Sequence, residues 1–345
     1  MEVKPSYSII FTGGPAVIGD PHLGKKFTNG VPLDRRGERE AHQYETFRVS
    51  LHAAAEESSL VVMMGDLFDQ YMVEGSDLYE TYLIYKEVAE AHPAVRFVLI
   101  RGNHDVSRYI ARRSSFDILA AMLEKFNNII VVLQPILLKE NSDVYLFFPY
   151  DAFQSTRELL TGIMRQFTTP GEKYTAIFGH WDIESFGGSD YNLCPFDLLA
   201  PTLVDGGKII TGHVHEAQIF TIPDETFQVI VTGSMLPYSH GEDSNGNIYV
   251  TMTLAEFEAA PISFRDKSVR LLLRPGQVPP DNIDALQISH KYVDDNKVEE
   301  TEVRMTNFSF KELFEKVFSE HGLDEEVTNA YWEKYKEKNT DDHTA

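Results

Sequence analysis

The chain has 345 residues, long enough for one large domain with a substantial core and a smaller unit besides. Hydrophobic residues make up 43% and charged residues 24% of it, which excludes the disordered, collagen-like and coiled-coil classes. The formal net charge of -22 argues against a free-standing nucleic-acid-binding protein, because Lys and Arg supply most non-specific affinity for phosphate. A nuclease whose carboxylates hold metal ions remains open, and the acidic balance favours one that works with a partner protein.

A single cysteine, Cys194, excludes an internal disulfide and any site built on paired cysteines. We expect it to be a small buried core residue in a reducing compartment. The first residues contain no basic stretch followed by an adequate apolar one, so no signal peptide is expected. No run approaches the ~18 apolar residues that a membrane-spanning helix needs. We therefore expect a cytoplasmic protein without membrane contact, in the host cytoplasm if the chain is viral.

The first two thirds of the chain alternate β-rich apolar runs with amphipathic stretches, which predicts an α/β domain. The predicted helices are Arg39–Ser58, Ser76–Ala91, Ser107–Phe126 and Ser155–Gln166. The predicted strands are Ala16–Gly19, Leu60–Met64, Val95–Ile100, Ile129–Leu133, Val144–Phe148, Ala176–Phe178, Lys208–Ile210, Gln228–Val231 and Ile248–Met252.

Beyond residue 261 the pattern changes to short β-like pieces separated by Pro- and Asp-rich segments. Two amphipathic helices are predicted after them, Ser309–Glu320 and Asp324–Lys338, with apolar residues at i, i+3, i+4 and i+7. We predict a main domain over residues 1–266, a small capping domain over 267–308 and a helical tail over 309–345. The tail either packs on its own domain or binds a partner.

Five short blocks of metal-binding side chains each follow a predicted strand. In chain order they are Asp20-Pro21-His22, Gly65-Asp66-Leu67-Phe68-Asp69, Gly102-Asn103-His104-Asp105, Gly179-His180 and Gly212-His213-Val214-His215. Because ligand sites in open α/β sheets gather at the carboxyl ends of the strands, we expect these blocks to meet.

The residue types suit a site for two divalent ions. Asp20 and His22 share a face at an extended strand end, and the carboxylate of Asp66 can bridge two ions. Asn103 offers a carbonyl oxygen, and imidazole nitrogens come from His180, His213 and His215. Mixed nitrogen and oxygen ligands without thiolate favour Mn²⁺, with Mg²⁺, Fe²⁺ and Zn²⁺ as alternatives.

Each block alone is a weak signal, since Gly-Asp is a common turn and a lone histidine is more often a hydrogen-bonded core residue. The five together, in one order and each after a strand, favour the metal site. The remaining histidines have no companion ligands and are interpreted as surface or core residues: His42, His52, His92, His240, His290 and His321.

In these blocks the sequence resembles the calcineurin-like metallophosphoesterase superfamily, whose pattern is D-x-H, G-D-x-x-D, G-N-H-[DE], G-H and G-H-x-H. The match covers about residues 16 to 215 with no ligand missing. The resemblance implies a four-layer α/β/β/α domain, a small capping domain and a C-terminal helical pair. It also implies that one ion is held by Asp20, His22, Asp66 and His215, and the other by Asp66, Asn103, His180 and His213.

Two such ions, about 3.5–4 Å apart, would clamp an in-line displacement at phosphorus. His104 lies beside a ligand without being needed as one, so we assign it as the general acid for the leaving oxygen. Asp105 is assigned as the carboxylate that orients the His104 imidazole by hydrogen bonding. A structural turn is the alternative role for His104. Asp69 stands where some relatives carry His, and a capping role is at least as well supported for it.

Basic residues cluster close in sequence to the blocks. They are either solvated surface charges or contacts to DNA phosphates, and we favour the second interpretation. The residues are Lys25, Lys26, Arg35, Arg36, Arg101, Arg108, Arg112 and Arg113.

Within the superfamily the sequence is most similar to the SbcD-type nuclease subunit of the SbcCD break-repair complex, through Asp20-Pro21-His22-Leu23-Gly24, Gly179-His180-Trp181 and the small domain before a helical tail. This resemblance implies a Mn²⁺-dependent 3′ to 5′ DNA exonuclease with endonuclease activity. Its implied partners are a second copy of the chain and an SbcC-like ABC-type ATPase bound by the C-terminal helices.

Two alternatives remain. A phosphomonoesterase or cyclic-nucleotide phosphodiesterase of the same superfamily would use the same metals, although Asp69-Gln70 and Asn103-His104-Asp105 differ from the Asp-Arg-Gly and Asn-His-Glu expected of Ser/Thr phosphatases. A non-catalytic scaffold would typically have lost ligands that this chain retains.

Overall fold

A computed structural model describes residues 9–109, 111–167, 173–183, 190–221, 226–243, 246–260, 263–280 and 283–293. The two helices predicted at the C-terminus lie outside the described residues, as do residues 294–308 of the predicted capping domain. Within the described ranges, no helix is both long and apolar enough to cross a membrane.

The first sheet has five strands in the order β1-β2-β3-β4-β5. Only the β1–β2 pair is antiparallel; β2 to β5 run parallel. Every residue of β3 is buried, as expected of a parallel strand covered on both faces. The strands are β1 (Ile9–Phe11), β2 (Ala16–Ile18), β3 (Leu60–Met63), β4 (Arg96–Ile100) and β5 (Ile129–Val132).

The second sheet has six strands in the order β10-β11-β9-β8-β7-β6. Its central strands β7, β8, β9 and β11 are parallel, and the two edge strands β6 and β10 are antiparallel to their neighbours. The strands are β6 (Ile136–Glu140), β7 (Asp143–Phe147), β8 (Tyr174–Gly179), β9 (Leu203–Thr211), β10 (Gln218–Thr221) and β11 (Gln228–Val231).

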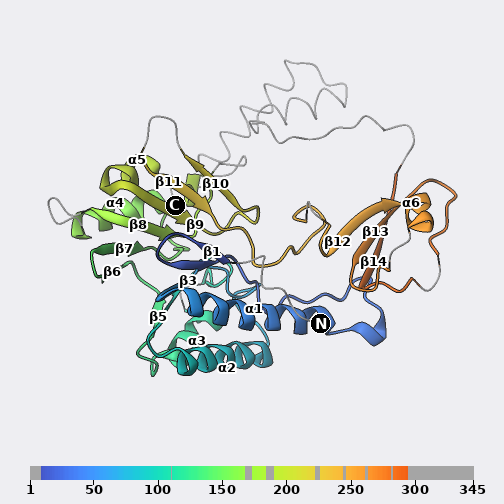
Figure 1. Ribbon diagram of the computed structural model, residues 1–345, viewed down its shortest axis with the longest axis horizontal. Helices are drawn as coiled ribbons and strands as arrows, with labels where there is room; N and C mark the ends of the chain where they lie inside the picture. The colour runs from blue at the N-terminus through green and yellow to red at the C-terminus, as the bar shows by residue number, and fades with distance from the viewer. Residues whose placement is uncertain are drawn as a thin grey trace, which may run out of the picture. The chain divides into compact units, whose positions relative to one another are not determined.

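The alternation of side chains along each strand separates the core into layers. Helices lie on the outer faces of the two sheets (Figure 1). Val61 and Met63 of β3 pack in a cluster with residues of helices α1, α2 and α3, whereas Val62 lies in a second cluster with Phe178 and Ile210 of the other sheet. A third cluster lies on the far face of the second sheet, with residues from helices α4 and α5. The helices are α1 (Glu38–Glu57), α2 (Gly75–Ala91), α3 (Ser115–Leu123), α4 (Thr156–Phe167) and α5 (Phe196–Leu199).

The predicted α/β class is therefore confirmed, with mixed sheets. Cys194 is buried in the third cluster, as expected. The helix predicted from Ser107 begins only at Ser115, because Ser114 caps it: the Ser114 side chain accepts from Asp117 N, and the Asp117 side chain accepts from Ser114 N. The preceding residues form the loop that carries His104.

A third, smaller sheet contains β12 (Tyr249–Thr253), β13 (Ser268–Leu273) and β14 (Gln287–Tyr292), all parallel, with helix α6 (Leu254–Ala259) between the first two. The domain boundary expected between residues 266 and 267 thus falls between two paired strands. Arg39 of α1 contacts this sheet: its guanidinium donates to Gln287 Oε1 at 2.8 Å and to the Tyr249 hydroxyl. The same guanidinium lies 3.6 Å from the ring centroid of Phe27, in the loop after the first block.

The two large sheets are joined where β2 ends. Asp20 forms an isolated bridge with Ser234, Asp20 N donates to the carbonyl of Gly233 at 3.3 Å, and Met235 N donates to the carbonyl of Asp20 at 3.0 Å. A side chain at Gly19 would overlap with the carbonyl of Gly233. This close approach of two backbones therefore requires a glycine and places the first metal-binding block beside the second sheet.

We expect Gly19→Ala to reduce the free energy of unfolding by roughly 1–3 kcal/mol, because the added methyl group must force the two segments apart. The matched control is Gly162→Ala in α4, where a Cβ meets nothing within 4 Å. It should stabilise the chain by about 0.5–1 kcal/mol. Urea denaturation of both variants checks the pair, and equal stability of Gly19→Ala and wild type would contradict the packing argument.

Candidate metal centre

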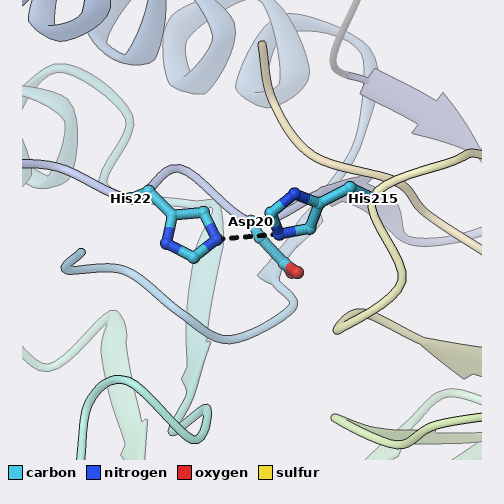
Figure 2. A group of neighbouring side chains, drawn as sticks. All are labelled: Asp20, His22 and His215. Carbon is cyan, nitrogen blue, oxygen red and sulfur yellow. Dashed lines mark hydrogen bonds between the residues drawn. The ribbon is translucent and has the colours of Figure 1, made fainter. Parts of the chain in front are cut away.

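Asp20, His22 and His215 form the first group of ligand-type side chains. Their candidate ligand atoms lie within 4.8 Å of one another. Figure 2 shows the two imidazoles pointing toward each other beside the carboxylate, with His22 Nε2 and His215 Nε2 3.0 Å apart. Asp20 is 0% and His22 3% exposed. The end of β2 and the loop after β9 thus bring three possible metal ligands to one place.

Asp66, His180 and His213 form the second group, again within 4.8 Å. Asn103 joins it, because its Oδ1 lies 2.9 Å from His180 Nε2 and 2.8 Å from His213 Nδ1. The partner of His180 fixes the tautomer of its neutral ring: Nδ1 donates to the carbonyl of Met64 at 2.9 Å, so in the neutral ring the Nε2 lone pair faces the group and can bind a metal ion.

Asp66 lies between the two groups. Its Oδ2 is 3.3 Å from His180 Nε2 on one side and 3.9 Å from His22 Nε2 on the other, and its Oδ1 accepts from the backbone N–H of His104 at 2.8 Å. The carboxylate is 2% exposed. The structure therefore brings together all seven side chains expected as ligands, with Asp66 in the position of a bridge.

The backbone is strained at this point. Among the described residues, four other than glycine have a positive φ, and three of them are His22 at 47°, Asp66 at 46° and His213 at 74°. Left-handed backbone is unfavourable for such residues and is typically kept where it aims a functional side chain. The strained backbone thus carries possible metal ligands of both the first and the second group.

The electrostatics of the group fit a bound cation. Asp20 Oδ1 is buried without a hydrogen-bond partner. Burial, partly offset by His180, raises the pKa of Asp20 to about 7. Burial lowers the pKa of His22 to about 3 and of His213 to about 4, so both imidazoles are neutral and able to bind metal. Divalent ions would favour the ionised form of Asp20 and satisfy its orphaned oxygen.

The pKa of His180 shows that the carboxylates around it favour a positive charge. Burial alone would lower its pKa, but the carboxylates of Asp66 and Asp20 raise it to about 10. Positive charge is therefore favoured between these two carboxylates, which is where metal ions would lie.

The role expected for Asp105 is wrong. Its carboxylate is 0% exposed and accepts hydrogen bonds from three backbone N–H groups, those of Leu67 at 3.1 Å, Phe68 at 3.0 Å and Gly102 at 2.9 Å. His104 instead has its Nδ1 2.6 Å from the carbonyl oxygen of Asp69. Asp105 therefore fastens the second block to the third, and a backbone carbonyl orients the imidazole.

His104 is the most open member of the site, with 42% of its side chain exposed and Nε2 4.0 Å from Asp66 Oδ2. The Asp69 carboxylate accepts from Lys25 Nζ at 2.9 Å. Asp69 thus neutralises a lysine at the rim and holds His104 through its backbone, which agrees with a structural role.

The basic residues near the blocks fall into two groups, those with a hydrogen-bond or ion-pair partner and those without a described carboxylate partner. Half of them are engaged: Lys25 with Asp69, Lys26 with Asp77, Arg35 with Glu38, and Arg101 with the carbonyl of Tyr150. The other four are exposed and form no ion pair with a described carboxylate; they are Arg36, Arg108, Arg112 and Arg113.

Sequence reasoning missed Glu242, which lies in the loop after β11. Its Oε2 is 3.3 Å from His215 Nδ1, while its two oxygens accept from Tyr238 N at 2.9 Å and Ser239 Oγ at 2.9 Å. These hydrogen bonds and His215 lower the pKa of Glu242 to about 2, although burial acts in the opposite direction. Glu242 thus orients His215, and no sequence pattern marks it.

We expect Glu242→Gln to weaken metal binding about 10- to 100-fold, because an oriented ligand histidine loses its carboxylate partner. Isothermal titration with Mn²⁺ measures the change. Glu216→Gln is the matched control, since it removes the same charge from an exposed residue next to His215. Equal affinities in the two variants would show that charge alone, and not orientation, matters.

No curated protein matches the chain. Among solved structures, a dimetal phosphatase from Danio rerio shares 13% identity over 64% of this chain and 87% of its own, with a TM-score of 0.38. GAP50, the anchor in the inner membrane complex of Plasmodium, shares 16% identity over 64% and 71%, with a TM-score of 0.37.

The family model described as calcineurin-like phosphoesterase matches residues 16–217. That range is more than half of the chain and contains all five blocks. The chain belongs to the calcineurin-like phosphoesterase family.

Proposed function

We propose that this metal-dependent phosphoesterase hydrolyses phosphodiester bonds in DNA. The observation that carries the choice of DNA is the group of Arg108, Arg112 and Arg113, which follows Asn103 and His104 directly. All three are exposed on a chain of net charge -22, and no described carboxylate neutralises them. Uncompensated arginines beside a metal centre suit a polyanion, whose phosphates they position without reading sequence.

The ligands of one ion are Asp20, His22, Asp66 and His215, and those of the other are Asp66, Asn103, His180 and His213. When bound, two divalent ions supply Lewis-acid stabilisation of the phosphoryl group and lower the pKa of the attacking water. Mn²⁺ is the first choice because nitrogen and oxygen donors are mixed and no thiolate is present among them.

His104 is the general acid. Its Nδ1–H is held by the carbonyl of Asp69 at 2.6 Å, so the proton to be transferred is on Nε2, which faces Asp66 at 4.0 Å. Exposure of 42% of the side chain lets a leaving oxygen reach that nitrogen. The fixed ring therefore delivers a proton at one place on the rim of the site.

The kind of nuclease and its partners are proposed from the resemblance to SbcD-type subunits. The chain acts as a 3′ to 5′ exonuclease and endonuclease in DNA repair or recombination, as a homodimer with an SbcC-like ABC-type ATPase. Residues 309–345, the proposed ATPase-binding tail, lie outside the described residues.

Deleting residues 309–345 should abolish co-purification with that ATPase and leave hydrolysis of a small phosphodiester intact. Unchanged co-purification would remove this partner.

We expect the wild type to shorten end-labelled duplex DNA in Mn²⁺, and His104→Gln to do so about 10²- to 10⁴-fold more slowly with both ions still bound. Gel analysis of the products gives the rate, and elemental analysis of the purified variant gives the metal content.

The control substrate is a phosphomonoester such as p-nitrophenyl phosphate. Rapid hydrolysis of the monoester with no cleavage of DNA would replace the nuclease by a phosphomonoesterase. Full nuclease activity of His104→Gln would remove the acid assignment but leave the substrate class intact.

A further inference from the structure

An exposed aromatic residue lies in the loop that carries the general acid. Tyr109 is 63% exposed, five residues after His104. The guanidinium of Arg112 lies over its ring, 4.6 Å from the centroid. A single exposed ring is common on protein surfaces, but this one has a guanidinium over it and lies in the loop of the general acid, where it can contact a ligand of the site.

The ring is held in place by its own loop. Tyr109 N donates to the hydroxyl of Ser107 at 3.1 Å, and Ser107 is itself 4% exposed. Arg112 N donates to the carbonyl of Tyr109 at 3.0 Å, which closes the turn that stacks the guanidinium on the ring. Tyr109 and Arg112 therefore form a preordered flat surface, so little conformational entropy is lost when a ligand stacks on it.

An aromatic pair, Tyr150 and Tyr191, lies beside the segment that leads into the third block. The Tyr150 and Tyr191 ring centroids are 6.5 Å apart, and Tyr150 N donates to the carbonyl of Arg101 at 2.8 Å, directly before the third block. Burial raises the pKa of Tyr150, while Arg108 lowers it and Asp66 raises it. The charges of Arg108 and of the Asp66 carboxylate therefore both act on this ring.

We propose that Tyr109, Arg112 and Arg108 form a subsite for one unpaired nucleotide of the DNA strand being cut. The base stacks on the face of the Tyr109 ring opposite Arg112, and Arg108 contacts the adjoining phosphate. Stacking of this kind accepts any base, because every base has a π-face. The inference rests on the proposed nuclease function and adds that the substrate is held as a frayed or single-stranded end.

Recognition by stacking explains why the pair is aromatic and basic together. Arginines alone would suit any polyanion, including the backbone of an intact duplex. A base within a duplex has both faces covered by its neighbours, so an exposed ring gains contact only with a base that has left the stack.

The test is binding of a single-stranded oligonucleotide carrying 2-aminopurine at its 3′ end, with no metal added so that no cleavage occurs. Wild type should quench the fluorescence through stacking. Tyr109→Ala should lose the quenching and bind about 5- to 150-fold more weakly, the loss expected for one stacked base. Tyr109→Phe should bind as wild type does, because the ring is retained.

Two controls separate stacking from other effects. An oligonucleotide with an abasic 3′ nucleotide should bind wild type and Tyr109→Ala equally. Tyr79→Ala removes a ring that is 56% exposed on α2, and it should change nothing. An equal loss of affinity on base-containing and abasic strands would overturn the subsite. So would no loss of affinity at all, which is the result expected if Tyr109 instead docks a protein.

The subsite and the proposed function fail separately. Cleavage of DNA by wild type together with unaltered binding by Tyr109→Ala would overturn the subsite alone. Absence of any DNA cleavage in Mn²⁺ would overturn the nuclease and, with it, the subsite.

Discussion

The structure depends on a buried carboxylate, that of Asp66, which two histidine rings and one backbone N–H surround. It is 2% exposed, with His180 at 3.3 Å, His22 at 3.9 Å and the N–H of His104 at 2.8 Å. A charge out of water is stable only when it is paired or coordinates a metal. A side chain at Gly102 would overlap with Asp66, and one at Gly65 with His180. These two glycines let three strand ends converge on one carboxylate.

Much of this arrangement could be predicted from the sequence. The five blocks each end a strongly apolar run, and strands β2, β3, β4, β8 and β9 deliver them to one place because parallel strands end at the same edge. The seven side chains that the structure brings together had been chosen from residue type, from their order and from the resemblance to the family. The alternation along β3 likewise decides which residues face the helices and which face the second sheet.

What could not be predicted depends on contacts between segments distant in sequence. Asp105 next to His104 suggested a hydrogen-bonded pair, but neighbours in a tight turn point apart, and Asp105 accepts from two backbone N–H groups of the second block and one of its own. Glu242 orients His215 from a loop without a pattern. The four arginines that pair with no described carboxylate could not be told apart from the four engaged basic residues until the partners of those four were placed. The late start of α3 follows from one capping residue, Ser114.

The central claim is that Asp66 serves two metal ions at once. Counting bound Mn²⁺ per chain by titration and electron paramagnetic resonance tests it directly, because ions that share a ligand give a coupled signal. Wild type should bind two coupled ions. Asp20→Asn should weaken only one of them, whereas Asp66→Asn should weaken both and abolish the coupling. Loss of a single ion in Asp66→Asn, with the other bound as in wild type, would contradict the account.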